Sequence, residues 1–316
     1  MENIKIIENI FALSGYENDL ALFLLSETKG YVDEGYIDKL GNVILRKKGT
    51  GEKLLINVPI SSDGFFISHI TEDFKGKIKG VGNICYEKML GKRVRNRDGK
   101  IIGVIMSDSD EVKDEDDLYV DFGAYKKEDV LVKVGDVLEV FEKSFEVGDN
   151  LYGVSVDRCL NISAHLDIIK NLNTDFDLYY CFSVMDNTGF KGAKTAAFSI
   201  NPDICITSSL SYENLKETDI KLNKGVVVRI KDSHIIVNKN LRDMVIKKLS
   251  QNLVPYQLEV LSNSGLSNNE IMYLNNGILT ANINLPAKEA GGLIKTVNKN
   301  DYKEFKKGLI AIINKG

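Results

Sequence analysis

The sequence predicts an α/β protein in which helices sandwich one sheet and a small β-domain is inserted into the chain. In the C-terminal half, helix and strand patterns alternate, and the strands are apolar throughout, as is typical of a sheet covered by helices on both faces. Residues 65–149 read instead as short strands separated by glycines, with no helix of normal length. We therefore predict a discontinuous α/β domain, residues 1–64 and 150–316, and an inserted β-domain, residues 65–149.

The composition excludes several classes of protein. The chain has 316 residues, is 43% hydrophobic and 27% charged, and carries a net charge of −4, which argues against nonspecific nucleic-acid binding. No apolar run approaches the roughly 20 residues of a membrane span, and the N-terminus is amphipathic rather than a signal peptide. The four cysteines form no CxxC pair, which favours reduced thiols and a cytoplasmic location. Only three histidines occur, and no two have the spacing of a ligand pair.

The N-terminal elements follow from periodicity and turn signals. Ile4, Ile7 and Phe11 fall on one face of a first helix. Ser14 and Glu17 have the spacing of a capping box for a second helix, which would run from Glu17 to Lys29. Three strands are then expected in the stretches YVDEGYI, NVILRKK and KLLINV.

The later elements are predicted in the same way. In the insert, RVRNRDGKIIGVI indicates a hairpin that turns at Asp98-Gly99. The basic residues of this stretch are better explained as exposed hairpin charge than as a nucleic-acid site. The helices expected after the insert are Arg158–Asn171, Leu241–Asn252, Ser267–Asn275 and Asp301–Asn314. The strands expected there are LYYCFSV, ICITSSL, GVVVRI, LEVL and LTANINL.

Two turns lie where a sheet of this type usually carries its active-site groups, at the carboxyl ends of strands. The turn after LLINV offers only Pro59, Ser61, Ser62 and Asp63. The turn in Met185–Ala197 offers an aspartate, an asparagine and several glycines, and a tight packing turn explains it equally well.

Short motifs are spread over nearly the whole chain. They are SGYE (Ser14–Glu17), DKLGN (Asp38–Asn42), LYVDFGA (Leu118–Ala124), GDVL (Gly135–Leu138), VDR (Val156–Arg158), TGFKGAKTAA (Thr188–Ala197) and NPD (Asn201–Asp203). In this order and spacing they resemble the dinuclear zinc or cobalt aminopeptidases of the TET-like, glutamyl aminopeptidase and cellulase M family. The resemblance implies a three-layer sandwich of the zinc-exopeptidase type, an inserted β-barrel-like domain, and homo-oligomers of at least two copies.

The resemblance also locates the family's metal ligands, and this chain departs from the pattern at each of them. The family's histidine in Ala-His-Met-Asp-Glu falls on Pro59, and the aspartate that orients it falls on Ser61. The metal-bridging aspartate of Asp-Asp-Arg falls on Val156, followed by Asp157. Asp157 and Arg158 are expected to form a structural ion pair or to support the turn.

The remaining positions are changed in the same sense. The general base and the next ligand of the family's Gln-Glu-Glu motif fall on Asp186 and Asn187. The last two ligands fall on Ser209 and Gly291. None of the five ligand positions, which hold Pro59, Val156, Asn187, Ser209 and Gly291, carries a good zinc ligand, so we expect no metal cofactor and no catalytic residue. The expected function is that of an inactive homologue that binds a peptide or small molecule in the old cleft, or of a regulatory or structural subunit.

The alternative is an active metal-dependent aminopeptidase or other hydrolase with a displaced site. Five acidic residues near the ligand-bearing loops offer oxygen ligands for a hard cation such as Mg²⁺, namely Asp63, Asp157, Asp186, Asp203 and Glu289. A glycan-degrading enzyme would need two facing carboxylates in a sugar cleft, and no such pair can be derived from the sequence.

Overall fold

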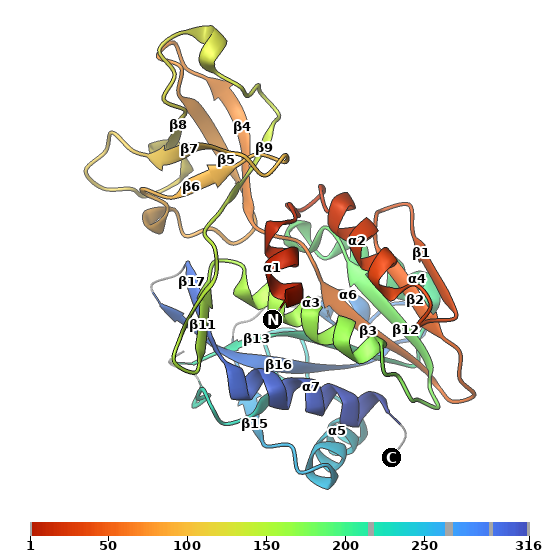
Figure 1. Cartoon of the computed structure of the whole chain (residues 1–316). Helices are drawn as coiled ribbons and strands as arrows, with labels where there is room; N and C mark the ends of the chain where they lie inside the picture. The colour runs from red at the N-terminus through yellow and green to blue at the C-terminus, as the bar shows by residue number, and fades with distance from the viewer. Residues whose placement is uncertain (1, 214–217, 263–267, 291–292, 315–316) are drawn as a thin grey trace.

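The computed structural model describes residues 2–213, 218–262, 268–290 and 293–314, and it divides into an 11-stranded sheet and a closed six-stranded barrel (Figure 1). The chain begins with two helices and three strands, and these are α1 (Glu2–Asn9), α2 (Asn18–Thr28), β1 (Glu34–Ile37), β2 (Val43–Lys47) and β3 (Lys53–Pro59). No helix among the described residues is long and apolar enough to cross a membrane.

The barrel follows β3 directly. Its strands are β4 (Gly64–Ile70), β5 (Gly76–Val81), β6 (Arg93–Arg95), β7 (Ile101–Met106), β8 (Tyr119–Asp121) and β9 (Val137–Val140), closed in the order β4-β5-β8-β7-β6-β9. Its interior is apolar and includes Phe65, Ile67, Ile78, Val94, Ile105 and Leu138. The predicted hairpin at Asp98-Gly99 is confirmed, because β6 and β7 pair antiparallel on either side of that turn. The only helices in this described segment are short 3₁₀ turns, Tyr86–Lys88, Glu115–Asp117 and Lys127–Asp129.

The rest of the chain completes the large sheet and its helical layers. Its strands are β10 (Phe145–Val147), β11 (Asn150–Gly153), β12 (Asp177–Ser183), β13 (Ile204–Tyr212), β14 (Val226–Lys231), β15 (Tyr256–Val260), β16 (Leu279–Ala290) and β17 (Ile294–Asn298). Its helices are α3 (Val156–Ile169), η4 (Asp186–Thr188), α4 (Lys191–Ile200), α5 (Lys239–Gln251), α6 (Asn268–Ile271) and α7 (Lys299–Ile313). The sheet order is β1-β2-β12-β3-β13-β16-β17-β11-β10, and β14 joins β16 to β15.

Helices cover both faces of this sheet. Strands β12, β3, β13 and β16 run parallel at its centre, and their side chains alternate between two cores. On β3, Leu54, Ile56 and Val58 join the larger core, to which α3 and α7 also contribute. Leu55 points to the smaller core, formed with α4 and α6. The predicted three-layer α/β sandwich with an inserted barrel is therefore confirmed.

Some details differ from the sequence prediction. The capping box is wrong, because the Ser14 hydroxyl has no hydrogen-bond partner and Glu17 makes no side-chain cap for α2. Strand β10, inside the predicted insert 65–149, pairs with β11 in the large sheet rather than with the barrel. The division into two folding domains, 1–64 with 150–316 and 65–149, stays a prediction.

Glycines allow the close approaches that shape the region between sheet and barrel. A Cβ on Gly64, the first residue of β4, would lie 2.2 Å from the carbonyl oxygen of Leu138 on β9. A Cβ on Gly192, in the first turn of α4, would lie 2.3 Å from the carbonyl oxygen of Val184. Any side chain at either place would push two elements apart. The glycine-rich turn of TGFKGAKTAA is thus explained at least in part by packing.

Candidate functional site

A cleft of about 360 Å³ lies between the sheet and the barrel. It is lined by the loop after β3, the start of α3, the end of β13, the first half of β17 and several barrel residues. Four of the predicted site positions line it, and they are Ser61, Asp157, Asn187 and Ser209. The fold therefore brings these distant segments together around one cleft.

The other predicted positions are placed differently. Val156 is 1% exposed and packs into the larger hydrophobic core, so its backbone position is kept without any donor side chain. Pro59 ends β3 without lining the cleft, and Asp186 is turned into the protein. Gly291 lies outside the described residues.

Asp186 belongs to a buried cluster that we call the loop network: Glu17, Ser61, Ser183 and Asp186. The Glu17 carboxylate accepts hydrogen bonds from the Ser61 hydroxyl at 2.6 Å, the Met185 N–H at 2.8 Å and the Gly15 N–H at 2.8 Å. The network thus ties the loops after β3 and β12 to the segment before α2. Sequence analysis assigned Glu17 to a helix cap and missed this role.

Asp186 accepts hydrogen bonds from the Ser183 hydroxyl at 2.9 Å and from the Ile60 N–H at 3.2 Å. It is 6% exposed. Burial raises the pKa of Asp186 to about 7, and the nearby Glu17 charge adds to the rise, while the hydrogen bonds oppose it. The Asp186 carboxyl group, which the resemblance puts at the general-base position, therefore holds the loops together and does not line the cleft.

The opposite side of the cleft is charged, and we call Asp157, Arg158 and Lys295 the charged wall. The Lys295 ammonium lies 2.5 Å from Asp157. Burial alone would lower the pKa of Lys295, but the Asp157 carboxylate outweighs that effect and raises it, so Lys295 is an ammonium at neutral pH. Lys295 stands in β17, a strand that sequence analysis did not predict, and nothing in its local sequence marked it.

The expected pair of Asp157 with Arg158 does not form, and Asp157 pairs instead with Lys295. Arg158 also lines the cleft but is only 8% exposed. Its Nε and Nη1 atoms have no hydrogen-bond partner, and no described carboxylate lies within 4 Å of it. A buried arginine in this state is unusual.

Barrel residues close the third side. Glu139 and Arg95 form a buried ion pair at 2.7 Å, and Glu139 also accepts hydrogen bonds from the Ser62 hydroxyl and the Ala12 N–H. Arg95 donates to the carbonyl oxygens of Glu8, Asn9 and Ile10 at the end of α1. This pair therefore fixes the barrel against the α/β layers.

Of the five acidic residues of the displaced-metal alternative, the four whose side chains the structure describes are not grouped in one place. Asp63 and Asp157 line the cleft. The protein around Asp63 partly desolvates its carboxyl group and so raises its pKa, although the residue is exposed. Asp203 precedes β13, at the end of the strand away from Ser209, and accepts from the Lys53 N–H at 2.8 Å. The side chain of Glu289 lies outside what the structure describes.

A dinuclear centre needs two cations about 3.5–4 Å apart, held by carboxylates or imidazoles. Among the described residues, no three His, Cys, Asp or Glu side chains are grouped to hold a metal ion. The Lys295 ammonium, next to Asp157, already supplies positive charge in the cleft. The donor set of this cleft therefore does not fit two metal ions.

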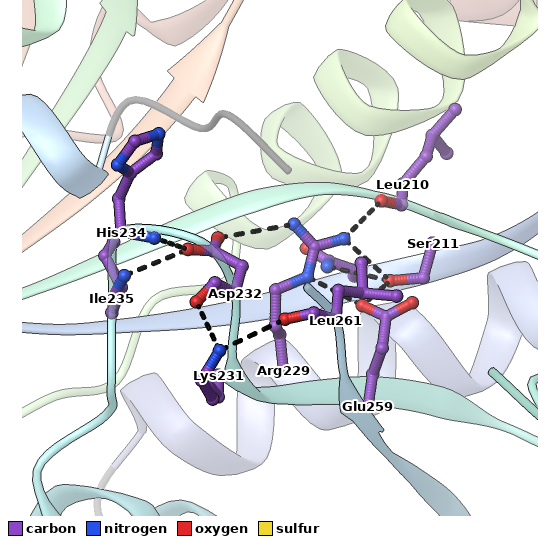
Figure 2. A network of polar contacts seen from close by, with 10 residues as sticks. Leu210, Ser211, Arg229, Lys231, Asp232, His234, Ile235, Glu259 and Leu261 are labelled. Carbon is purple, nitrogen blue, oxygen red and sulfur yellow. Dashed lines mark hydrogen bonds and ion pairs between the residues drawn. The ribbon is translucent and has the colours of Figure 1, made fainter. Parts of the chain in front are cut away.

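A second polar cluster lies beside the cleft, where β13, β14 and β15 end (Figure 2). Arg229 contacts Glu259 at 2.6 Å and Asp232 at 3.9 Å, and Ser211 donates to Glu259 at 2.7 Å. All four residues are at most 4% exposed. The cluster therefore stiffens these strand ends and is not open to a ligand.

Comparison with known proteins agrees with the fold and identifies the family. The family model for M42 glutamyl aminopeptidases matches residues 41–307. A curated protein of Acetivibrio thermocellus with an aminopeptidase name is 28% identical over 322 residues, which cover 98% of this chain and 97% of that protein. The lysyl aminopeptidase of Pyrococcus furiosus is 24% identical over 94% of this chain and 91% of its own length. A solved aminopeptidase from Desulfurococcus kamchatkensis has a TM-score of 0.93 at 25% identity, over all of this chain and 94% of that one.

Proposed function

Because the chain belongs to the M42 glutamyl aminopeptidase family, we propose that it is a peptide-binding member that does not hydrolyse its ligand by two-metal chemistry. The observation that carries this proposal is the charged wall. Where two metal ions would be needed, the cleft holds the Lys295 ammonium in contact with Asp157. A lysine there repels a divalent cation and uses the carboxylate that would bind it.

The loop network supports the same proposal. Catalysis would need a carboxylate within hydrogen-bond reach of a water in the cleft. The carboxyl group of Asp186 is instead held by Ser183 and the Ile60 N–H, inside the protein. The remaining function is recognition, for which the cleft keeps polar residues such as Ser61, Asn187 and Ser209.

The test is hydrolysis of aminoacyl amides by the purified chain with zinc, cobalt or manganese added, alongside elemental analysis. We expect no metal-dependent turnover and far less than one metal ion per chain. Metal-dependent turnover that disappears in Asp186→Asn would overturn the proposal. The proposed peptide binding is tested by calorimetric titration of the chain with short unmodified peptides.

The second candidate function is an active metal-dependent aminopeptidase with an atypical site. Family membership and the aminopeptidase names of the relatives favour it. Within the cleft its acidic candidates are Asp63 and Asp157. If this second function is correct, the chain should show turnover that is lost when Asp63 and Asp157 are both changed to asparagine. The control Asp203→Asn, at the other end of β13, should leave turnover unchanged.

We also propose that the chain forms homo-oligomers. The similar TET1 peptidase of Pyrococcus horikoshii, with a TM-score of 0.90 at 25% identity, can assemble into a tetrahedron or a large octahedral shell. For this chain we expect at least a dimer, checked by light scattering during size-exclusion chromatography. A monomer at working concentrations would contradict this. We also propose that the chain is located in the cytoplasm.

A further inference from the structure

Arg158 is the residue of the cleft that the proposed fold and function leave unexplained. It lies in the first turn of α3, lines the cleft and is 8% exposed. Its Nε and Nη1 atoms have no hydrogen-bond partner in the described part of the chain. Buried guanidinium groups are normally paired, because removing an unpaired charge from water is unfavourable. This geometry calls for an external acceptor.

The neighbouring charges indicate what kind of acceptor fits. Lys295 already pairs with Asp157 at 2.5 Å, and Arg95 pairs with Glu139 at 2.7 Å. These two cations therefore do not compete with Arg158 for an anion. Asp63 also lines the cleft and belongs to neither pair, and it would repel a dianion such as phosphate more strongly than a carboxylate, which adds a single negative charge.

We infer that Arg158 binds the carboxylate group of a peptide ligand in this cleft, an inference that rests on the proposed peptide-binding function. The planar guanidinium matches a carboxylate with two parallel hydrogen bonds. Ser155, Asn187 and Ser209 line the same cleft and supply polar groups for the peptide backbone. A cleft of about 360 Å³ lies in the usual size range for a small ligand. The carboxylate comes either from the C-terminus of the peptide or from an acidic side chain.

The experiment is calorimetric titration of the full chain with three probes. Trialanine carries a C-terminal carboxylate, trialanine amide carries none, and acetyl-Ala-Glu-Ala amide carries only a side-chain carboxylate. We expect one of the two carboxylate probes to bind at least about tenfold more tightly than trialanine amide. Arg158→Gln should remove this difference, and Arg158→Lys should keep part of it. Arg97→Gln, an exposed arginine of the barrel, is the matched control and should behave like the unmodified chain.

The outcomes separate the inference from the function on which it rests. Equal binding of acid and amide probes overturns the role of Arg158 but leaves peptide binding intact. A tenfold preference that survives in Arg158→Gln overturns it as well. Failure of every probe to bind at millimolar concentration overturns peptide binding, and with it the inference. Thermal melting of Arg158→Gln, checked against Arg158→Lys, excludes misfolding as the cause of lost binding.

Discussion

The two sides of the cleft treat charge in opposite ways. In the loop network, both oxygens of Glu17 and both oxygens of Asp186 accept hydrogen bonds from loops that meet there. In the charged wall, Arg158 keeps two nitrogen atoms without a partner. The first arrangement favours stability and the second favours binding, since a satisfied group has nothing left to offer a ligand. The cleft therefore has a scaffold side and, in our proposal, a recognition side.

The largest expected effect is on the scaffold side. Glu17→Ala removes an acceptor of three hydrogen bonds and leaves the Ser61 hydroxyl and two N–H groups without it. We expect the free energy of unfolding to fall by about 3–5 kcal/mol, measured by urea denaturation. Asp19→Asn, on the exposed part of the same helix, is the control and should change it by less than about 1 kcal/mol. A similar loss in both variants would mean that the network is not what joins these loops.

Asp186 gives the scaffold side a defined pH dependence. Its pKa in the folded protein, about 7, lies above the ordinary value of 3.8, so the folded state holds its proton more tightly than the unfolded state does. The contribution of Asp186 to stability is therefore full below about pH 4 and is lost as the pH rises to about 7. The shift sets an upper limit of about 4 kcal/mol on that loss.

Asp186→Asn should remove this dependence. Unfolding free energies measured between pH 5 and pH 8 should decline less steeply in the variant than in the unmodified chain. The difference between the two curves isolates Asp186 from other groups, such as Asp63, that titrate in the same range. Parallel curves would show that Asp186 is not a buried, proton-holding carboxyl group.

The fold could be predicted from sequence because local patterns fix it. The apolar strand around Leu54–Val58 and the glycines at its end report directly on burial and close approach. The family resemblance then pointed to Ser61, Asp157, Asn187 and Ser209, and these four residues line the cleft.

The chemistry of the cleft could not be predicted, because it depends on contacts between distant segments. Glu17 looked like a cap residue, since its spacing from Ser14 fits a capping box, yet it bonds Ser61, 44 residues away. Lys295 reaches Asp157 across 138 residues. Asp157 and Arg158 are neighbours in sequence and were expected to pair or to support the turn, but Asp157 pairs with Lys295 instead. Spacing along the chain therefore predicts helices and strands more reliably than it predicts the hydrogen-bond or ion-pair partner of a side chain.

The charged wall can be tested by a double-mutant cycle between Lys295 and Asp157. The two side chains are 19% and 21% exposed, so solvent weakens their attraction. Lys295→Met alone should lower the free energy of unfolding by about 1–2 kcal/mol, because it leaves Asp157 near Asp63 without a cation. Adding Asp157→Asn should recover about 1 kcal/mol of that loss. Strict additivity of the two changes would mean that the pair makes no net contribution.

Arg158→Met gives the smallest change in stability and the only one expected to be positive. Methionine keeps the length of the side chain and removes a buried charge that has no partner, so the free energy of unfolding should rise by about 1 kcal/mol. Arg95→Met is the opposing control. That arginine is equally buried but pairs with Glu139 and donates to three carbonyl groups, so its loss should cost about 3–5 kcal/mol. A functional group that is held at the expense of stability shows this pattern, because its removal stabilises the protein and weakens its binding of ligand. If Arg158→Met were as damaging as Arg95→Met, Arg158 would be part of the scaffold, and the contrast between the two sides of the cleft would disappear.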